Sequence, residues 1–513
     1  MLVLSDLRFD GERFVREPAT LRITGGILTS IEPGTPPAPP SATVPALPSA
    51  TVPDLPAATP DDDVLDARGR LVMPGLIDAH AHIARAGFFE PGEPPLQVAQ
   101  IIRNFQGALR AGVTTIADMG CTIPLMRRLR ALTDHDPLAG PRFLGAGPVL
   151  TAPEGYPFVW ISKLWRHAEA ALPIADEVAA AHAVGRTVEG GMDHVKVAIM
   201  HESFARTPLP ALTPKAARAV VAEAHALGRR VYAHAHSTRD YEVALDAGVD
   251  GLMHSSFDPL SPDLVQRIVD AGVAVNPTLW AYDSTCLTGA CRIHERADLQ
   301  RHATPALRRS WRRFADAYAA SGPVFPRTSI VAGVQKHVAE GAMRVAAANA
   351  RILHDAGVPL VFGNDASFGV ALLARPIDEL DAMRRAGMSV AACLRSATAG
   401  AADLLGAPHL GRLRPGAAAD LVIAPRGLEH DLALLDADRE GITLEVVARG
   451  RRVPATTTPA RLAAIALAYV QGTGDTLVRT VTNATRALGA KLAGSPASPG
   501  LLAKLGLTAR TTT

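Results

Sequence analysis

A short unit that recurs along the 513-residue chain constrains its fold more than any other feature. The tripeptide Ala-Gly-Val occurs at 111, 247, 271 and 356, each time after a helix-like stretch and before an apolar run. Glycine just past a helix takes the left-handed conformation that ends it, and the valine can start a buried strand. A helix followed by a buried strand, several times over, predicts an α/β fold.

The chain contains eight strand candidates, at 74–80, 113–118, 142–147, 193–199, 230–234, 249–254, 273–278 and 358–364. Eight strands separated by helices predict a (β/α)8 TIM barrel, in which the chemistry lies at the carboxyl ends of the strands. A doubly wound sheet is the competing layout. It is disfavoured because no glycine-rich phosphate loop follows the first strand candidate.

The segments outside this barrel predict a small β-sandwich domain built from both ends of the chain. Residues 1–70 supply its first part, which a Pro-rich insertion at 33–60 interrupts, and residues 406–454 supply the second. The barrel then occupies residues 71–405. Residues 455–513, rich in Ala, Leu and Thr, predict a C-terminal helical tail that packs on the barrel or at a subunit contact.

Composition indicates a soluble enzyme in the cytoplasm. Apolar residues make up 48% of the chain and charged residues 20%, and the formal net charge of +2 favours neither nucleic acid nor an anionic membrane. The chain begins Met-Leu-Val-Leu-Ser-Asp, which is not a signal peptide, and no stretch is long and apolar enough to span a bilayer. Its four cysteines do not form a disulfide scaffold.

The first barrel strand carries a possible chelating pair. Asp78, His80 and His82 are spaced two apart, so on a strand they line one face. Two neutral imidazoles on one face can bind Zn²⁺ or a similar divalent ion. A His-x-His pair alone is common, and the interpretation therefore depends on the later strands.

Polar residues also end four later strand candidates. Taken singly, each has an ordinary structural explanation, such as a helix cap or a surface lysine, but one per expected strand indicates a site. His80, His82 and Asp365 can hold one ion and His234 and His254 a second, while His236 could replace His234 as a ligand because both lie on one face of the strand. The residues that end the later strands are Lys196, His234, His254 and Asp365.

Several motifs resemble those of the metal-dependent amidohydrolase superfamily. They include Pro-Gly-Leu-Ile-Asp-Ala-His-Ala-His at 74–82, His-Ala-His at 234–236, Ala-Gly-Val-Asp at 247–250 and Gly-Arg-Leu-Arg-Pro-Gly-Ala-Ala-Ala-Asp-Leu at 411–421. The chain looks most like the branch that contains imidazolonepropionase and Xaa-Pro dipeptidase-like enzymes. The resemblance covers nearly everything except the Pro-rich insertion, the excursion at 281–345 and about the last sixty residues.

This resemblance implies a site with two Zn²⁺ ions bridged by a carboxylated Lys196. The implied reaction is hydrolysis of a carbon–nitrogen amide bond, linear or cyclic, by a metal-activated hydroxide. Asp365 and His254 are the candidate catalytic residues, with Asp365 as the proton carrier. Two alternatives stay open: an aminohydrolase that deaminates a heterocycle, and a metal-free scaffold of the same fold. The resemblance disfavours deamination, because Ser237 stands where the deaminases carry Glu.

Loops after the predicted strands carry aromatic and polar side chains that would share one mouth of the barrel. They predict a small-molecule substrate with an aromatic or bulky apolar part. The helix-prone excursion at 281–345, with basic clusters, could form a lid or a solvated helix face. We also expect a homo-oligomer. The candidate substrate-binding residues are His201, Tyr156, Trp160, Arg239 and Trp280, with Phe88, Phe89, Arg206 and Tyr282 nearby.

Overall fold

The computed structural model describes residues 1–34, 63–83, 98–159, 169–203, 206–286, 296–324, 334–366, 371–458, 460–462 and 464–465. The predicted Pro-rich insertion lies almost wholly outside these residues, as does most of the predicted C-terminal tail. Within the described part, no helix is both long enough and apolar enough to cross a membrane.

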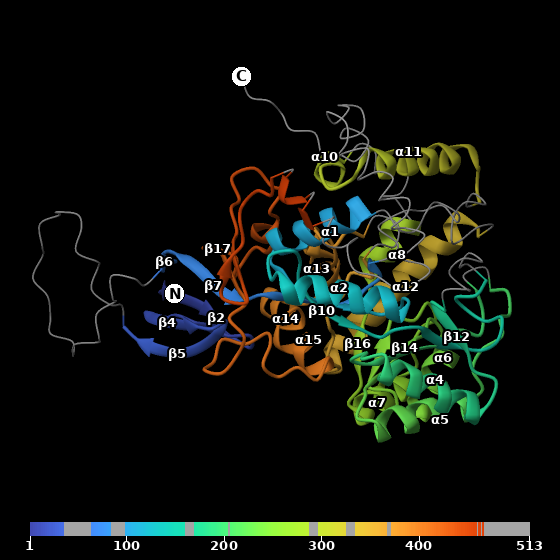
Figure 1. Cartoon of the computed structure of the whole chain (residues 1–513). Helices are drawn as coiled ribbons and strands as arrows, with labels where there is room; N and C mark the ends of the chain where they lie inside the picture. Colours follow the sequence, from blue (N-terminus) through green and yellow to red (C-terminus); the bar gives the residue numbers. More distant parts are fainter. Residues whose placement is uncertain are drawn as a thin grey trace, which may run out of the picture.

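Two parallel sheets hold most of the predicted barrel strands (Figure 1). The first has the order β10-β9-β8, with β8 (Leu76–Ala81), β9 (Val113–Asp118) and β10 (Arg142–Gly145). The second has the order β12-β11-β13-β14-β15-β16, with β11 (Val149–Thr151), β12 (Ala171–Pro173), β13 (Val195–Ala198), β14 (Val231–His234), β15 (Gly251–Met253) and β16 (Ala274–Asn276). The predicted α/β fold with parallel strands is confirmed.

The eighth predicted strand, 358–364, is not a regular strand. Leu360 forms an isolated parallel bridge with Val275 of β16, and Ala366 forms another with Ala81 of β8. Backbone hydrogen bonds also join the segment to both sheets, from Val361 N–H to Val275 and from Ala79 N–H to Phe362, but they do not form a regular ladder. Its end departs from extended geometry because Asp365 has a φ of 49°. A closed barrel stays a prediction.

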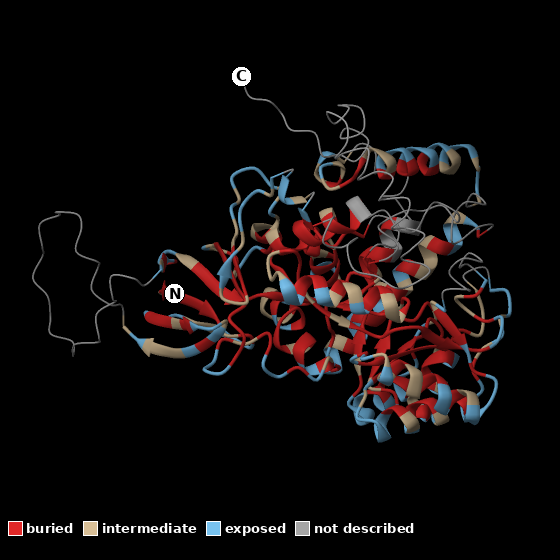
Figure 2. Cartoon of the chain, in the orientation of Figure 1, coloured by how far each residue is buried: buried red, intermediate tan, exposed pale blue. Residues whose placement is uncertain are grey.

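The helices begin and end where the sequence signals place them. Gly248 and Gly272, with φ of 81° and 63°, end two helices, and the hydroxyls of Thr213 and Ser261 accept the capping N–H bonds that start two. The helices between and after the parallel strands are α1 (Val98–Arg110), α2 (Ile123–His135), α4 (Glu177–Glu189), α5 (Pro214–Ala226), α6 (Thr238–Ala247), α7 (Pro262–Ala271), α8 (Leu279–Cys286), α13 (Pro376–Arg385), α14 (Val390–Ser396) and α15 (Ala399–Leu404). Buried residues concentrate in the strands and on the inner sides of these helices (Figure 2).

Strands from both ends of the chain lie together at the left of Figure 1. One sheet has the order β5-β4-β1-β6 and the other β19-β18-β17-β7-β2-β3, and β17 pairs antiparallel with β7. One apolar cluster includes Val3 and Leu21 of the first sheet and Val72 and Ile423 of the second. The bounds are β1 (Leu2–Ser5), β2 (Leu7–Phe9), β3 (Phe14–Val15), β4 (Ala19–Thr24), β5 (Ile27–Pro33), β6 (Val64–Asp66), β7 (Arg70–Pro74), β17 (Leu421–Pro425), β18 (Glu445–Ala448) and β19 (Arg451–Arg452).

The excursion at 281–345 contains α10 (Ala297–Gln300), α11 (Pro305–Ala320) and the start of α12 (Lys336–Asp355). Leu307, Trp311 and Phe314 of α11 are buried in the main core, so one face of this helix packs on the domain. The guanidinium of Arg308 donates to the carbonyl of Gln300. A lid role for this excursion stays a prediction.

Candidate metal centre

The first group of candidate ligands comes together where β8 ends. His80 lies in β8, His82 follows it, and Asp365 ends the segment that bridges to β8. Nε2 of His82 lies 3.3 Å from Oδ1 of Asp365, and Nε2 of His80 lies 3.6 Å from the same oxygen. Ligands that share one zinc ion at about 2.0–2.2 Å are separated by about 3.3 Å in tetrahedral geometry. These three side chains are therefore spaced as ligands of one ion.

Asn276, at the end of β16, orients the His80 ring. Its Oδ1 lies 2.8 Å from Nδ1 of His80, and its Nδ2 donates to the carbonyls of Val361 and Gly363. Because these two bonds fix the amide orientation, with Nδ2 as the donor, Oδ1 accepts a hydrogen bond from the N–H at Nδ1 of His80. The lone pair of His80 then lies on Nε2, the atom that faces Asp365.

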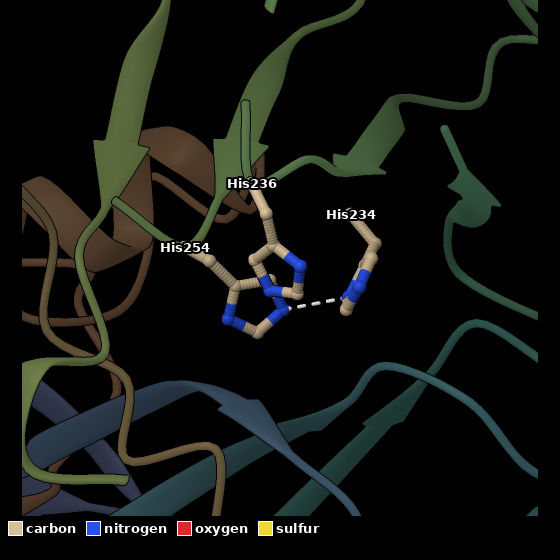
Figure 3. Close-up of side chains that lie close together, drawn as sticks. All are labelled: His234, His236 and His254. Atoms are coloured by element: carbon tan, nitrogen blue, oxygen red, sulfur yellow. Dashed lines mark hydrogen bonds between the residues drawn. The ribbon is translucent and has the colours of Figure 1, made fainter. Parts of the chain in front are cut away.

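The second group is a trio of buried histidines that follows β14 and β15 (Figure 3). Nε2 of His254 lies 2.8 Å from Nδ1 of His234, and one nitrogen from each of the three rings lies within 4.8 Å of the others. The sequence left His236 as an alternative to His234, and the structure brings both to the cluster. Tyr156 stacks on His234 with ring centroids 4.2 Å apart.

Lys196 of β13 is buried and interacts electrostatically with both groups. Burial lowers the pKa of Lys196 to about 7, against the opposing effect of Asp365. Burial also lowers the pKa of His80 and that of His234 well below the usual range, and the charge of Lys196 lowers both further. The charge of this one amine therefore acts on ligands of both groups.

The buried atoms fit divalent ions. Within the described part of the chain, Nε2 of His80, Nε2 of His234 and Nζ of Lys196 are buried and have no hydrogen-bond partner. Burying polar atoms without a partner costs free energy, and functional sites are where that cost is tolerated. Neutral imidazoles with a carboxylate form the donor set that zinc prefers. The two groups can therefore accept metal ions.

Backbone strain concentrates at the same residues. His254 has a φ of 84°, and Thr278 and Asp365 both have a φ of 49°. Such values are uncommon for residues other than glycine, and they cluster at functional sites. Thr278 also forms a hydrogen bond with a candidate metal ligand, since its Oγ1 lies 2.9 Å from Nδ1 of His254. Residues with a positive φ therefore include both candidate ligands and a residue that positions one of them.

The predicted substrate-binding residues have different surroundings. Tyr156 contacts the histidine trio, and Nδ1 of His201 lies 2.7 Å from a carboxylate oxygen of the buried Asp240. Trp280 is buried at the start of α8, whereas Arg239 is exposed in the first turn of α6. The remaining predictions, on Trp160, Phe88, Phe89 and the side chain of Tyr282, lie outside the described residues.

Sequence reasoning missed several polar residues that position the site. Asn276 lies in the seventh strand candidate, 273–278, and ends the observed strand β16, so the rule that placed His254 could have found it had the end of the strand been predicted correctly. Asp240 completes the local capping pattern that starts at Ser237, which could have marked it, whereas Glu379 lies about a hundred residues from its hydrogen-bond partners and no local signal marks it. The missed residues are Asn276, Thr278, Asp240 and Glu379.

Two groups of candidate metal ligands thus lie at or just beyond the carboxyl ends of parallel strands, which is where barrel enzymes carry their active sites. The model of the amidohydrolase family matches residues 71–453, and the chain belongs to this family. Imidazolonepropionase from Geobacillus kaustophilus (strain HTA426) is 27% identical over 377 residues, which cover 70% of this chain and 76% of that protein. The predicted family and its branch are confirmed.

Two further proteins are similar over much of the chain. An uncharacterised protein from Mycobacterium tuberculosis (strain ATCC 25618 / H37Rv) is 28% identical over 350 residues, covering 68% of this chain and 78% of that protein. The crystal structure of a Xaa-Pro dipeptidase with bound methionine in the active site has a TM-score of 0.66 at 20% identity. This match covers 88% of this chain and 98% of that chain, and shows a common fold.

Proposed function

We propose that the chain is a metal-dependent hydrolase that cleaves a carbon–nitrogen amide bond, linear or cyclic, in a small molecule. The observation that carries the proposal is the pair of candidate ligand groups at the strand ends, together with a buried lysine, Lys196, whose charge acts on both. Membership of the amidohydrolase family supports it, as does the similarity to imidazolonepropionase and to a Xaa-Pro dipeptidase. The proposal includes a closed (β/α)8 barrel with a β-sandwich at its side.

The chain offers ligands for two ions. His80, His82 and Asp365 would hold one Zn²⁺, and His234 and His254 a second, with His236 as an alternative ligand. Lys196 would bridge the two ions after carboxylation. Only the neutral amine combines with CO₂, so the lowered pKa of Lys196 favours this reaction. Ions bound there would polarise the amide carbonyl and acidify a water molecule.

Asp365 is the residue placed to move the proton. Its carboxylate is almost fully buried, lies near the imidazoles of His80 and His82, and interacts electrostatically with the amine of Lys196. A carboxylate in this position can accept the proton of the attacking water and deliver it to the departing nitrogen. His254, the second candidate catalytic residue, is held by Thr278 and faces His234. Both residues serve as ligands and take part in the reaction.

Deamination is the weaker alternative. Ser237 stands three residues after His234, and its hydroxyl accepts the N–H of Asp240 as the N-cap of α6. The Asp240 carboxylate completes this capping box, so the position is used to start a helix. The metal-free scaffold is the other alternative, and the two groups of histidine and aspartate side chains that could hold an ion speak against it.

The proposal is tested with protein prepared with bicarbonate and Zn²⁺ and assayed against dipeptides, N-acyl amino acids and cyclic amides. We expect a new amine or carboxylate from at least one class, loss of this activity with a chelator, and its return with Zn²⁺. Ammonia release from heterocyclic amines without amide cleavage would support deamination instead. Protein that binds no metal and cleaves none of these amides would support the scaffold alternative.

A further inference from the structure

A cavity of about 160 Å³ lies beside the histidine trio. We call it the α12 cavity, because α12 supplies much of its wall; the loop after β13, the start of α6 and Phe257 supply the rest. Met200, Phe257, Ala339, Ala342 and Met343 give it an apolar lining. An apolar cavity of about 150 Å³ is large enough to bind benzene. The α12 cavity can therefore hold a side chain of that size.

The cavity reaches the candidate metal centre through His236. The His236 ring lines the cavity and stacks on Phe257, with ring centroids 5.1 Å apart. The same ring belongs to the trio with His234 and His254. A group in the cavity is thus separated from the candidate ligands by one imidazole. A side chain of the substrate could therefore occupy the cavity while the amide lies at the candidate ligands.

The charged side chains that line the cavity, such as Arg206 and Asp240, already have ion-pair or hydrogen-bond partners within the protein. Arg206 is the only Lys or Arg among the described lining residues, and its guanidinium pairs with Glu202 and, at 2.8 Å, with Asp258. Asp240 accepts hydrogen bonds from the His201 imidazole and from the N–H of Ser237. A substrate carboxylate would have to compete with two carboxylates for Arg206. The cavity therefore favours an uncharged group.

We propose that the α12 cavity is the subsite for an uncharged apolar side chain of the substrate, a branched aliphatic or benzene-sized aromatic group. This inference deepens the proposed function and rests on it for the reaction, although binding can be measured without turnover. Apolar burial supplies the affinity, because transfer of apolar surface out of water is favourable. Specificity then follows from side-chain size.

Binding is tested with protein labelled with ¹³C in its methionine methyl groups. Met200 and Met343 line the cavity, and their signals are assigned with Met200→Leu and Met343→Leu. Titration of the wild type with N-acetylphenylalanine amide should shift both signals saturably, whereas N-acetylglycine amide should not. Ala342→Phe should abolish the shifts by filling the cavity. Ile352→Phe, at an exposed position of α12, is the control for added bulk and should keep them.

Turnover provides the second measurement. For amides that the enzyme cleaves, Ala342→Phe should lower kcat/KM for large apolar side chains tenfold or more, by the order of magnitude of pocket discrimination, and spare small ones. Equal shifts with both probes, shifts that persist in Ala342→Phe, or no shift in the wild type would overturn the subsite. Saturable shifts without any amide cleavage would support the subsite and contradict the proposed function, so the two can fail separately.

Discussion

Asn276 fixes which nitrogen atom of His80 faces Asp365. Its amide accepts from Nδ1 of His80 at 2.8 Å and donates to two carbonyls on the segment that ends in Asp365. The same side chain thus orients a candidate ligand and ties two strand ends together. Outer partners of this kind commonly decide how tightly a metal site binds its ion.

We expect Asn276→Ala to weaken metal binding at the first ligand group by about 10- to 100-fold. The reason is that His80 loses the partner that holds its proton on Nδ1. Competition with a chromophoric chelator measures the affinity, and urea unfolding of the metal-free protein shows how much of the change is general destabilisation. An unchanged affinity in a folded Asn276→Ala protein would reject this positioning role.

Lys196 should be carboxylated in protein that holds both ions. Prepared with ¹³C-bicarbonate and excess Zn²⁺, the wild type should bind about two ions per chain and show a carbamate carbon signal. Lys196→Gln should lose the signal and retain about one ion, because the bridging group is gone. Lys215→Gln, at an exposed lysine of α5, is the control. This variant should keep both the carbamate signal and the wild-type metal content. A wild type without the carbamate signal would refute the prediction.

Asp365→Asn should remove most of the activity. Asparagine keeps the shape of the side chain but cannot accept the proton, so we expect turnover to fall on the order of a hundredfold or more. Asp263→Asn, at an exposed position in α7, provides the matched control. Turnover is compared at saturating substrate in protein shown to hold its metal. Near wild-type turnover in an Asp365→Asn protein that holds its metal would exclude Asp365 as the proton carrier.

The candidate ligands follow from local rules, and their role as ligands stays a prediction. His80 lies in β8 and His82 just after it, Lys196 lies in β13, and His254 directly follows β15, so each is close to an apolar run that is visible in the sequence. The strand predicted at 358–364 is irregular in the structure, where Leu360 forms an isolated bridge with Val275, and pairing between segments so far apart leaves no local signal.

The tertiary partners could not be predicted from local patterns. Glu379 lies 99 residues from Trp280, and Asn276 lies 196 residues from His80. Propensity and periodicity describe neighbours in sequence, so they carry no signal for such pairs. The α12 cavity was missed for the same reason, because its walls come from four separate segments.

Glu379 holds the start of α8 and thereby the residue that contacts His254. Its carboxylate accepts the N–H of Leu279 at 3.0 Å and that of Trp280 at 2.6 Å, and Thr278 directly precedes them. Burial raises the pKa of Glu379 from 4.5 to about 8. The folded state therefore retains this proton to a higher pH than the unfolded chain does. Its contribution to stability is fully present below about pH 4.5 and is lost as the pH rises to about 8.

Glu379→Gln removes this titration, so the stability of the wild type relative to this variant should fall with rising pH. The expected slope is at most about 1.4 kcal/mol per pH unit, the value for one proton, between about pH 4.5 and 8. Urea unfolding of the metal-free proteins at several pH values measures it. Glu440→Gln, at an exposed glutamate, is the control and should leave the slope unchanged. Parallel stability curves for wild type and Glu379→Gln would show that Glu379 is ionised in the folded state near pH 5.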